Sequence, residues 1–218
     1  RLYRACNNID LVVVPSNFTR NVIKRSGIIY KKIEVVPEWF NQNILSKSQC
    51  DKTKSKDDRY IFNTKFNFLV MGLITGIEPS CDIKNMFRTV QWLLEEFKGE
   101  EDVGIVLKTS FGKSTKLDML NTKNYIENLV SNFREGPFPK IHLIHGNMTE
   151  KEVAALYSVN SIKALATATR GEGYGLPIID AAASGVPVLA TGWSGHLDFL
   201  GEDLFTQVDY DLVEIPKK

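Results

Sequence analysis

The residues of this sequence with the clearest chemical potential lie between positions 169 and 188, in the run TRGEGYGLPIIDAAASGVPV. The acidic residue Glu172 stands in a glycine-rich loop, directly after an apolar run at 163–168 that predicts a buried strand. Gly173 and Gly175 let the backbone adopt conformations that bring its amides close to a ligand. The spacing alone leaves two interpretations open, a ligand cradle or glycines that serve only the turn.

The segment after this loop, residues 176–183, predicts a helix with a proline in its first turn, where proline is tolerated. Gly185 fits a helix C-terminus, and residues 186–190 predict the next strand. The first N–H groups of a helix have no acceptor within the helix, and the helix start carries a partial positive charge, so it attracts anions. A strand, glycine loop, helix and strand in this order form the unit at which α/β proteins often bind nucleotides.

The elements that position this unit alternate along the chain. Apolar runs predict strands at residues 11–14, 32–36, 66–71, 103–108, 141–145, 163–168 and 186–190. Helical periodicity and capping residues such as Ser16 and Thr149 predict helices at residues 16–25, 83–97, 117–133, 150–157 and 176–183. This alternation predicts the α/β class, with a doubly wound parallel sheet.

The composition excludes several classes of protein. With 218 residues, of which 43% are hydrophobic, the chain suffices for one good core. Its 27 basic and 26 acidic residues nearly cancel, so no nucleic-acid-binding surface is expected. No apolar run approaches the roughly 20 residues that span a bilayer, and no signal peptide is expected. Three separated cysteines are typical of reduced thiols, which favours a cytoplasmic protein.

The motif EGYGLP, followed by DAAA and GVPV, resembles the signature of the GT-B glycosyltransferases of the large family 4, or group 1, type. That signature is an E-x7-E motif of the form EGFGLPxxEAxAxGxPV. The match runs without a gap from Glu172 to Val188. One position departs from it, because Asp180 stands where the second glutamate is expected.

The resemblance extends to the start of the chain and implies a domain organisation. The segments DLVVVPSNFTRNVIKRSG and KIEVVPEWFN resemble the end of the N-terminal, acceptor-binding domain and the crossing between domains. Residues 1–44 are therefore expected to be a remnant of that domain, and residues 45–60 a polar linker. Residues 61–218 are expected to form the Rossmann-like, nucleotide-sugar-binding C-terminal half of a GT-B fold.

The resemblance also implies roles for individual residues. Glu172 would face the donor sugar, Lys84 would neutralise the diphosphate, and Asp180 would bind the ribose hydroxyls. The expected donor-binding residues further include the backbone amides of Gly173, Tyr174, Gly175 and Leu176, a strand-end cation at Lys108, and Asn147 and Met148 near the nucleobase. The alternatives are a solvated loop acid at 172, an exposed helix acid at 180, and ordinary surface lysines at 84 and 108.

The cation pair that these enzymes use for the diphosphate departs from the pattern. Leu73 stands where an arginine is expected, and Lys84, at the expected start of a helix, matches the second cation. Arg88 lies one turn further on and is a candidate helper. No histidine has a second metal ligand at a helical spacing, and GT-B enzymes usually need no metal, so no metal or cofactor is expected.

The first functional hypothesis is the donor-binding half of a retaining glycosyltransferase of the hexosyltransferase type. Its partners would be a nucleotide-sugar donor and an unidentified acceptor, with a missing N-terminal domain or a second copy of the chain. The alternative is a catalytically weak or inactive nucleotide-binding relative, favoured by Leu73 and Asp180. An epimerase on the same fold is less consistent with the E-x7-E-like spacing.

Overall fold

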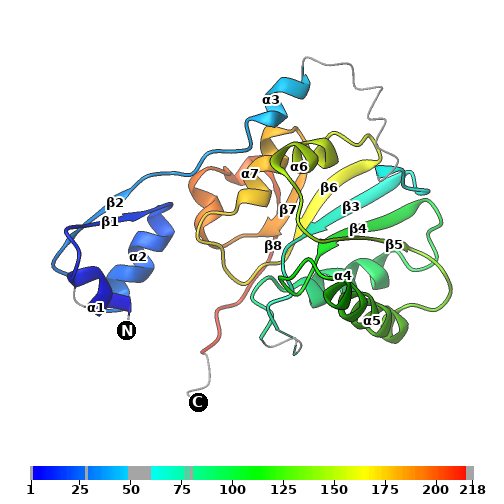
Figure 1. Ribbon diagram of the computed structural model, residues 1–218, viewed down its shortest axis with the longest axis horizontal. Helices are drawn as coiled ribbons and strands as arrows, with labels where there is room; N and C mark the ends of the chain where they lie inside the picture. The colour runs from blue at the N-terminus through cyan, green and yellow to red at the C-terminus, as the bar shows by residue number, and fades with distance from the viewer. Residues whose placement is uncertain (1, 28, 49–59, 77, 79–80, 215–218) are drawn as a thin grey trace.

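The computed structural model describes residues 2–27, 29–48, 60–76, 78 and 81–214. Its main feature is a six-stranded sheet with the strand order β5-β4-β3-β6-β7-β8, in which every neighbouring pair is parallel. A separate two-stranded parallel sheet, β1-β2, lies near the N-terminus (Figure 1). The predicted α/β class with a parallel, doubly wound sheet is confirmed.

The strands of the two sheets are β1 (Leu11–Val14), β2 (Lys32–Val35), β3 (Phe66–Met71), β4 (Val103–Thr109), β5 (Lys140–His145), β6 (Ile162–Thr167), β7 (Val188–Thr191) and β8 (Thr206–Val208). The helices are α1 (Leu2–Asn7), α2 (Asn17–Arg25), α3 (Asn43–Ser48), α4 (Met86–Glu96), α5 (Lys116–Phe133), α6 (Glu150–Tyr157) and α7 (Leu176–Ala183). Two short 3-10 turns, η2 (Gly195–Asp198) and η3 (Glu202–Leu204), precede β8.

Helices cover the two faces of the large sheet and divide its core in two (Figure 1). Helices α4 and α5 pack on one face, against Phe68, Val70, Ile105 and Leu107. Helices α6 and α7 pack on the other face, against side chains of β3, β4, β6 and β7. Because the central strands are buried on both faces, they read as continuous apolar runs rather than alternating ones.

The N-terminal segment forms its own small cluster, in which α1 and α2 cover one face of β1-β2 through Cys6, Val12, Val14 and Ile23. Ser16 caps α2 as predicted, since its hydroxyl accepts a hydrogen bond from the Thr19 amide. Helix α2 contacts η2, and α3 contacts α6, so this segment touches the large sheet domain at two places.

Helix α4 begins three residues later than the sequence predicts. Asn85 adopts a left-handed backbone conformation with φ 52°, and the carboxylate of Asp82 accepts the Phe87 amide at 3.2 Å. The helix therefore starts at Met86, and Lys84 lies in the loop before it rather than in its first turn. The predicted cap at Thr149 is confirmed, as part of a capping box with Glu152.

Other differences lie where the apolar pattern is weak. Helix α3 begins at Asn43, before the expected linker of residues 45–60, and extends into it as far as Ser48. Residues 49–59 of that linker lie outside the described residues, and Tyr60 is buried in the core. Strand β7 begins at Val188, because the Val186 amide still bonds to the Ala181 carbonyl at the end of α7. The turns η2 and η3 and strand β8 have no clear apolar period, and the sequence did not predict them.

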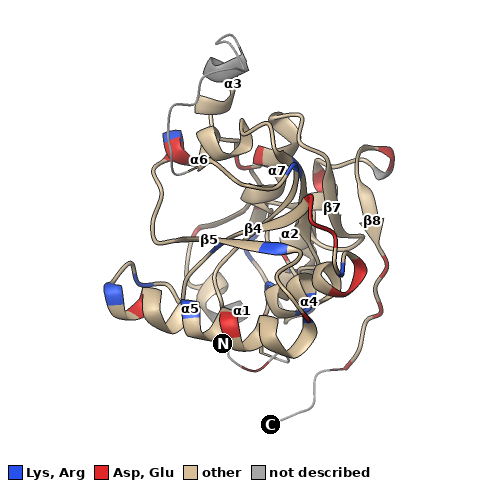
Figure 2. Ribbon diagram, turned by 90° about the vertical axis from the view of Figure 1, so that its right-hand side faces the viewer, with Lys and Arg blue, Asp and Glu red and all other residues tan. Residues whose placement is uncertain are grey.

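Basic and acidic residues are both scattered over the helices and loops in the view of Figure 2, and the net charge of the chain is +1. No helix in the described part of the chain is both long and apolar enough to cross a bilayer.

Candidate functional site

The candidate site lies at the edge of the large sheet where the parallel strands end. There Lys84 Nζ lies 2.6 Å and 2.8 Å from the two carboxylate oxygens of Glu172. The Glu172 side chain is 12% exposed and that of Lys84 is 32% exposed. A β-carbon on Gly72 would lie 3.4 Å from Lys84 Cγ, which places the end of β3 beside this ion pair. The carboxylate therefore lies at the predicted edge of the sheet.

The loop after β7 holds the backbone of Glu172 through hydrogen bonds. The Ser194 hydroxyl accepts the Glu172 amide at 2.5 Å and donates to the Glu172 carbonyl at 2.7 Å. The Gly195 amide donates to the same carbonyl at 3.0 Å. Gly195 has to be glycine, because a β-carbon there would collide with the carbonyl oxygen of Gly173. These hydrogen bonds from Ser194 and Gly195 fix the position of the Glu172 backbone, and with it the carboxylate, relative to the sheet.

The loop from Gly173 to Leu176 presents a run of backbone amides. Gly175 has φ 106°, a left-handed conformation that favours glycine, and its carbonyl accepts the first hydrogen bonds of α7. The amides of Gly173, Tyr174, Gly175 and Leu176 donate to no acceptor among the residues that the structure describes. Free amides at a helix start, beside an ammonium group, suit a phosphate or hydroxyl ligand.

The side chains of this loop have separate, structural environments. The Tyr174 ring is buried against Phe199, at 4.9 Å between ring centroids, and this burial raises the pKa of its phenol. Leu176 is 48% exposed on the surface. The predicted contribution of these two residues thus rests on their backbones.

Asp180 is not an exposed helix residue: it is 8% exposed on α7. Its Oδ1 accepts the backbone amide of Asn41 at 2.8 Å. Burial raises the pKa of this carboxyl, and the hydrogen bond from Asn41 opposes that rise. Its second oxygen has no hydrogen-bond partner among the described residues. Asp180 therefore attaches the segment after β2 to α7 and keeps one oxygen available.

Lys108, Asn147 and Met148 lie further along the same edge. Lys108 Nζ donates to the Gly146 carbonyl at 2.6 Å, and burial lowers the pKa of its ammonium group. The Asn147 amide donates to Ser114 Oγ at 3.0 Å, and Met148 packs against the core under α6. No hydrogen bond between described residues joins these three side chains to Glu172, but the Gly72 amide donates to the Lys108 carbonyl at 3.1 Å, so the end of β4 lies beside the strand end next to Lys84.

The cations expected around the diphosphate are only partly present. Leu73 is 49% exposed, two residues after the end of β3. The Arg88 guanidinium bonds to Gln91 at 2.7 Å and lies 5.5 Å from the centre of the Phe87 ring, so it is engaged with its own helix. Lys84 is thus the predicted diphosphate cation that directly contacts Glu172.

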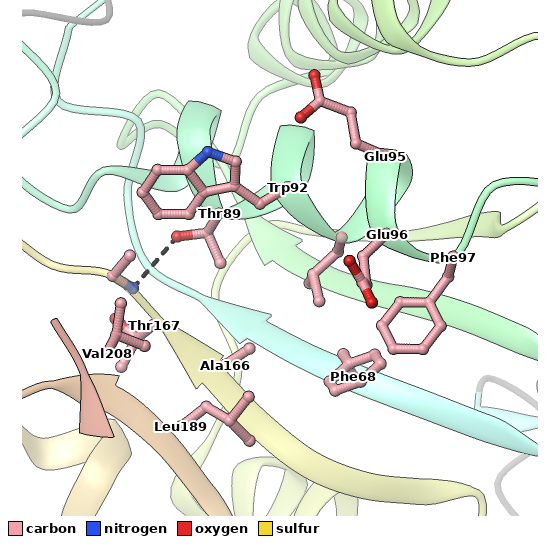
Figure 3. A pocket seen from close by; sticks show the side chains of 12 residues that line it. Phe68, Thr89, Trp92, Glu95, Glu96, Phe97, Ala166, Thr167, Leu189 and Val208 are labelled. Atoms are coloured by element: carbon pink, nitrogen blue, oxygen red, sulfur yellow. Dashed lines mark hydrogen bonds between the residues drawn. The ribbon is translucent and has the colours of Figure 1, made fainter. Parts of the chain in front are cut away.

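A cavity of about 590 Å³ lies elsewhere, between α4 and strands β6 to β8 (Figure 3). Trp92 of α4 and Phe97, which directly follows that helix, face Ala166 and Leu189 of the sheet across it. Thr89 Oγ1 accepts the Ala168 amide at one end of the cavity. Neither Glu172 nor Lys84 lines this cavity, so it is not the candidate site. Among the residues that the structure describes, no group of three histidine, cysteine or acidic side chains could hold a metal ion.

Sequence reasoning missed the residues that hold the glycine loop from the N-terminal segment. Ser16 and Thr19 both bond to the Gly173 carbonyl, and Asn41 bonds to Asp180. The only signal for Ser16 was its position as a helix cap, which does not reveal a contact 157 residues away. Ser194 and Gly195 belong to a glycine-rich run, GWSGH, whose pattern alone assigns no partner.

No protein-family model and no curated protein sequence matches the chain. Solved structures do match. A glycosyltransferase from Rickettsia africae has a TM-score of 0.63 and 17% identity, over 95% of this chain and 52% of its own. The C-terminal domain of a group 1 glycosyl transferase from Francisella tularensis has a TM-score of 0.52 and 19% identity, over 79% of this chain and 75% of its own.

A UDP-forming α,α-trehalose-phosphate synthase from Burkholderia xenovorans, in complex with glucose-6-phosphate, has a TM-score of 0.62 and 12% identity, over 94% of this chain and 52% of its own. The chain spans about half the length of the Rickettsia and Burkholderia proteins. At these identities the likeness establishes the fold: the sheet and its helices match the Rossmann-like domains of GT-B glycosyltransferases.

Proposed function

We propose that this chain is the donor-binding half of a retaining glycosyltransferase, which moves a sugar from a nucleotide-sugar to an acceptor hydroxyl. The observation that carries the proposal is the direct contact between Lys84 and Glu172 at the sheet edge. The four backbone amides that follow Glu172 donate to no acceptor among the residues that the structure describes. An ammonium group and free amides suit a diphosphate, and a carboxylate suits sugar hydroxyls. The matching solved structures include glycosyltransferases, one of them described as UDP-forming.

The geometry favours positioning and electrostatics as the source of catalysis. In the proposed step the bond between the sugar C1 and the diphosphate oxygen breaks, and the nucleoside diphosphate leaves with the electron pair. The acceptor oxygen bonds to C1 from the same face, and its proton passes to the departing phosphate oxygen. Lys84 and the loop amides stabilise the charge that develops on the phosphate, while Glu172 orients the sugar.

The second candidate is a nucleotide-binding relative with weak or no transferase activity. Two observations favour it: Leu73 provides no charge where a cation would help, and one oxygen of Asp180 is already occupied by the Asn41 amide. Both functions require nucleotide binding, so a binding measurement comes first and transfer second.

Calorimetric titration of the chain with UDP, GDP and ADP, and with their glucose or mannose derivatives, tests the proposal. We expect one nucleotide to bind, and the corresponding nucleotide-sugar to bind more tightly. Absence of heat with every ligand, on protein shown to be folded by circular dichroism, would contradict both candidates. Binding without any transfer or slow donor hydrolysis would support the second candidate over the first.

A further inference from the structure

The start of α2 is seated on the glycine loop, although the two segments are far apart in the chain. The Ser16 hydroxyl donates to the Gly173 carbonyl at 2.5 Å, and the Thr19 hydroxyl donates to the same oxygen at 3.1 Å. Ser16 is fully buried. A single carbonyl oxygen thus has both of its lone pairs occupied by side chains of the N-terminal segment.

Neighbouring contacts hold α2 in this position. The amide and the side-chain nitrogen of Asn17 donate to Asp198 Oδ2 at 2.6 and 2.9 Å. The Phe18 ring meets the Trp193 ring edge to face, with 4.8 Å between centroids. Asp198 and Trp193 belong to the segment after β7 that also holds the Glu172 backbone. Helix α2 and its cap therefore contact both the glycine loop and the segment that holds this loop in place.

These contacts determine where the loop amides point. A peptide unit is planar and trans, so the carbonyl of one residue and the amide of the next point in opposite directions. Because the Gly173 carbonyl points at α2, the Tyr174 N–H points away from α2. The Glu172 carbonyl points at Ser194 and Gly195, so the Gly173 N–H is turned away from that loop in the same manner.

We propose that Ser16 and Thr19 are positioning residues of the donor site: they hold the peptide between Gly173 and Tyr174 so that its amide stays available to the ligand. This inference rests on the proposed function and assigns the N-terminal segment a part in donor binding. Without the two hydroxyls the glycine-flanked peptide can rotate, since glycine has little torsional restriction. Rotation would place a carbonyl, rather than an amide, toward the anion.

The test compares Thr19→Val, and Thr19→Val combined with Ser16→Ala, with the wild-type chain. Valine retains the branched shape of threonine, and the single variant leaves the Ser16 cap of α2 intact. Ser26→Ala is the matched control, because that hydroxyl bonds only locally, to the Val22 carbonyl at the other end of α2. Titration with the nucleotide-sugar measures the dissociation constant, and NMR follows the amide signals of Gly173 and Tyr174.

We expect the dissociation constant to rise about threefold in Thr19→Val and about tenfold or more in the double variant. The loss corresponds to the hydrogen bond from the Tyr174 amide to the charged phosphate, which a rotated peptide no longer makes. The Tyr174 amide signal should shift and exchange faster with solvent, while Ser26→Ala changes neither quantity. Unchanged affinity and an unchanged Tyr174 signal in the folded double variant would overturn the inference.

The two readouts separate this inference from the proposed function. If the wild-type chain binds no nucleotide, the proposed function fails, and the part in donor binding fails with it. The Tyr174 signal then shows whether the two hydroxyls still hold the loop. If the wild type binds and the variants bind equally well, the proposed function stands and Ser16 and Thr19 are only structural.

Discussion

Lys84 and Glu172, which are 88 residues apart in the chain, form an ion pair in which Nζ contacts both carboxylate oxygens. Each group is partly withdrawn from water, and each satisfies the charge of the other. In the proposed function the two groups serve different parts of one ligand, the diphosphate and the sugar. The pair is therefore expected to open, or to share Lys84, when a donor binds.

Removal of the ammonium group should weaken nucleotide binding. We expect Lys84→Met to raise the dissociation constant for the nucleoside diphosphate about 10-fold to 100-fold, the effect of losing a charge-assisted contact. Calorimetric titration measures it. Lys98→Met is the matched control, since Lys98 is exposed and its ion pair with Glu135 lies on the surface. Equal affinity of Lys84→Met and wild type would refute this role of Lys84.

Removal of the carboxylate charge should have the opposite effect on the bare nucleotide. Glu172→Gln releases Lys84 and removes a negative charge near the diphosphate, so the nucleoside diphosphate should bind about threefold to tenfold more tightly. The advantage of the nucleotide-sugar over the bare nucleotide should shrink, because a carboxylate contact to the sugar is lost. Titration of both ligands measures the ratio, with Glu101→Gln as an exposed control. A preserved ratio would contradict the assignment of Glu172 to the sugar.

The missing arginine also makes a prediction. Leu73 is half-exposed and directly follows Gly72, which lies against the Lys84 side chain. We expect Leu73→Arg to tighten nucleoside diphosphate binding about threefold to tenfold by adding a second cation. If the chain transfers sugar when joined to an acceptor domain, the rate should rise as well. The comparison variant is Leu73→Gln, which adds polarity without charge; an equal gain in both variants would argue against an electrostatic cause.

Gly195, which packs against the backbone of the glycine loop, should not tolerate a side chain. Gly195→Ala brings a methyl group into the Gly173 carbonyl, so we expect a loss of about 1–3 kcal/mol in the free energy of unfolding by urea. Gly171→Ala in the same region is the control, because its β-carbon would meet the Trp193 ring at an ordinary 3.7 Å. Equal stability of the two variants would contradict the close approach of Gly195 in η2 to the Gly173 carbonyl.

Stability should fall in mild acid because of a buried histidine. His196 is fully buried, its Nε2 bonds to the Thr191 carbonyl at 2.8 Å, and burial lowers its pKa below the ordinary 6.5. As the pH falls below 6.5, the unfolded chain binds a proton at this histidine more readily than the folded chain does, so the free energy of unfolding decreases.

Urea unfolding at several pH values checks this, with His196→Gln expected to show a shallower decline. His142 contributes with the same sign, because burial lowers its pKa too. Asp180 acts in the opposite direction, since burial raises the pKa of its carboxyl. The difference between wild type and His196→Gln isolates the histidine, and parallel curves would disprove its contribution.

Local sequence patterns predicted most of the secondary structure. Strand β4 and helix α7 were predictable because apolar runs, a first-turn proline and a closing glycine act within a few residues. The start of α4 was not, because its position depends on the Asp82 carboxylate and on the left-handed Asn85. Strand β8 was missed as well, since its three residues depend on pairing with β7.

The sequence by itself determined that the chain folds as an α/β sheet with a glycine loop and an acidic residue at its edge, because period and turn residues express themselves locally. Only the tertiary structure decided that Lys84 meets Glu172, that Asp180 accepts from Asn41, and that Ser16 and Thr19 hold the Gly173 carbonyl. Those contacts join segments far apart in the chain. Their geometry depends on strand order and on the packing of loops, which no short stretch of residues encodes.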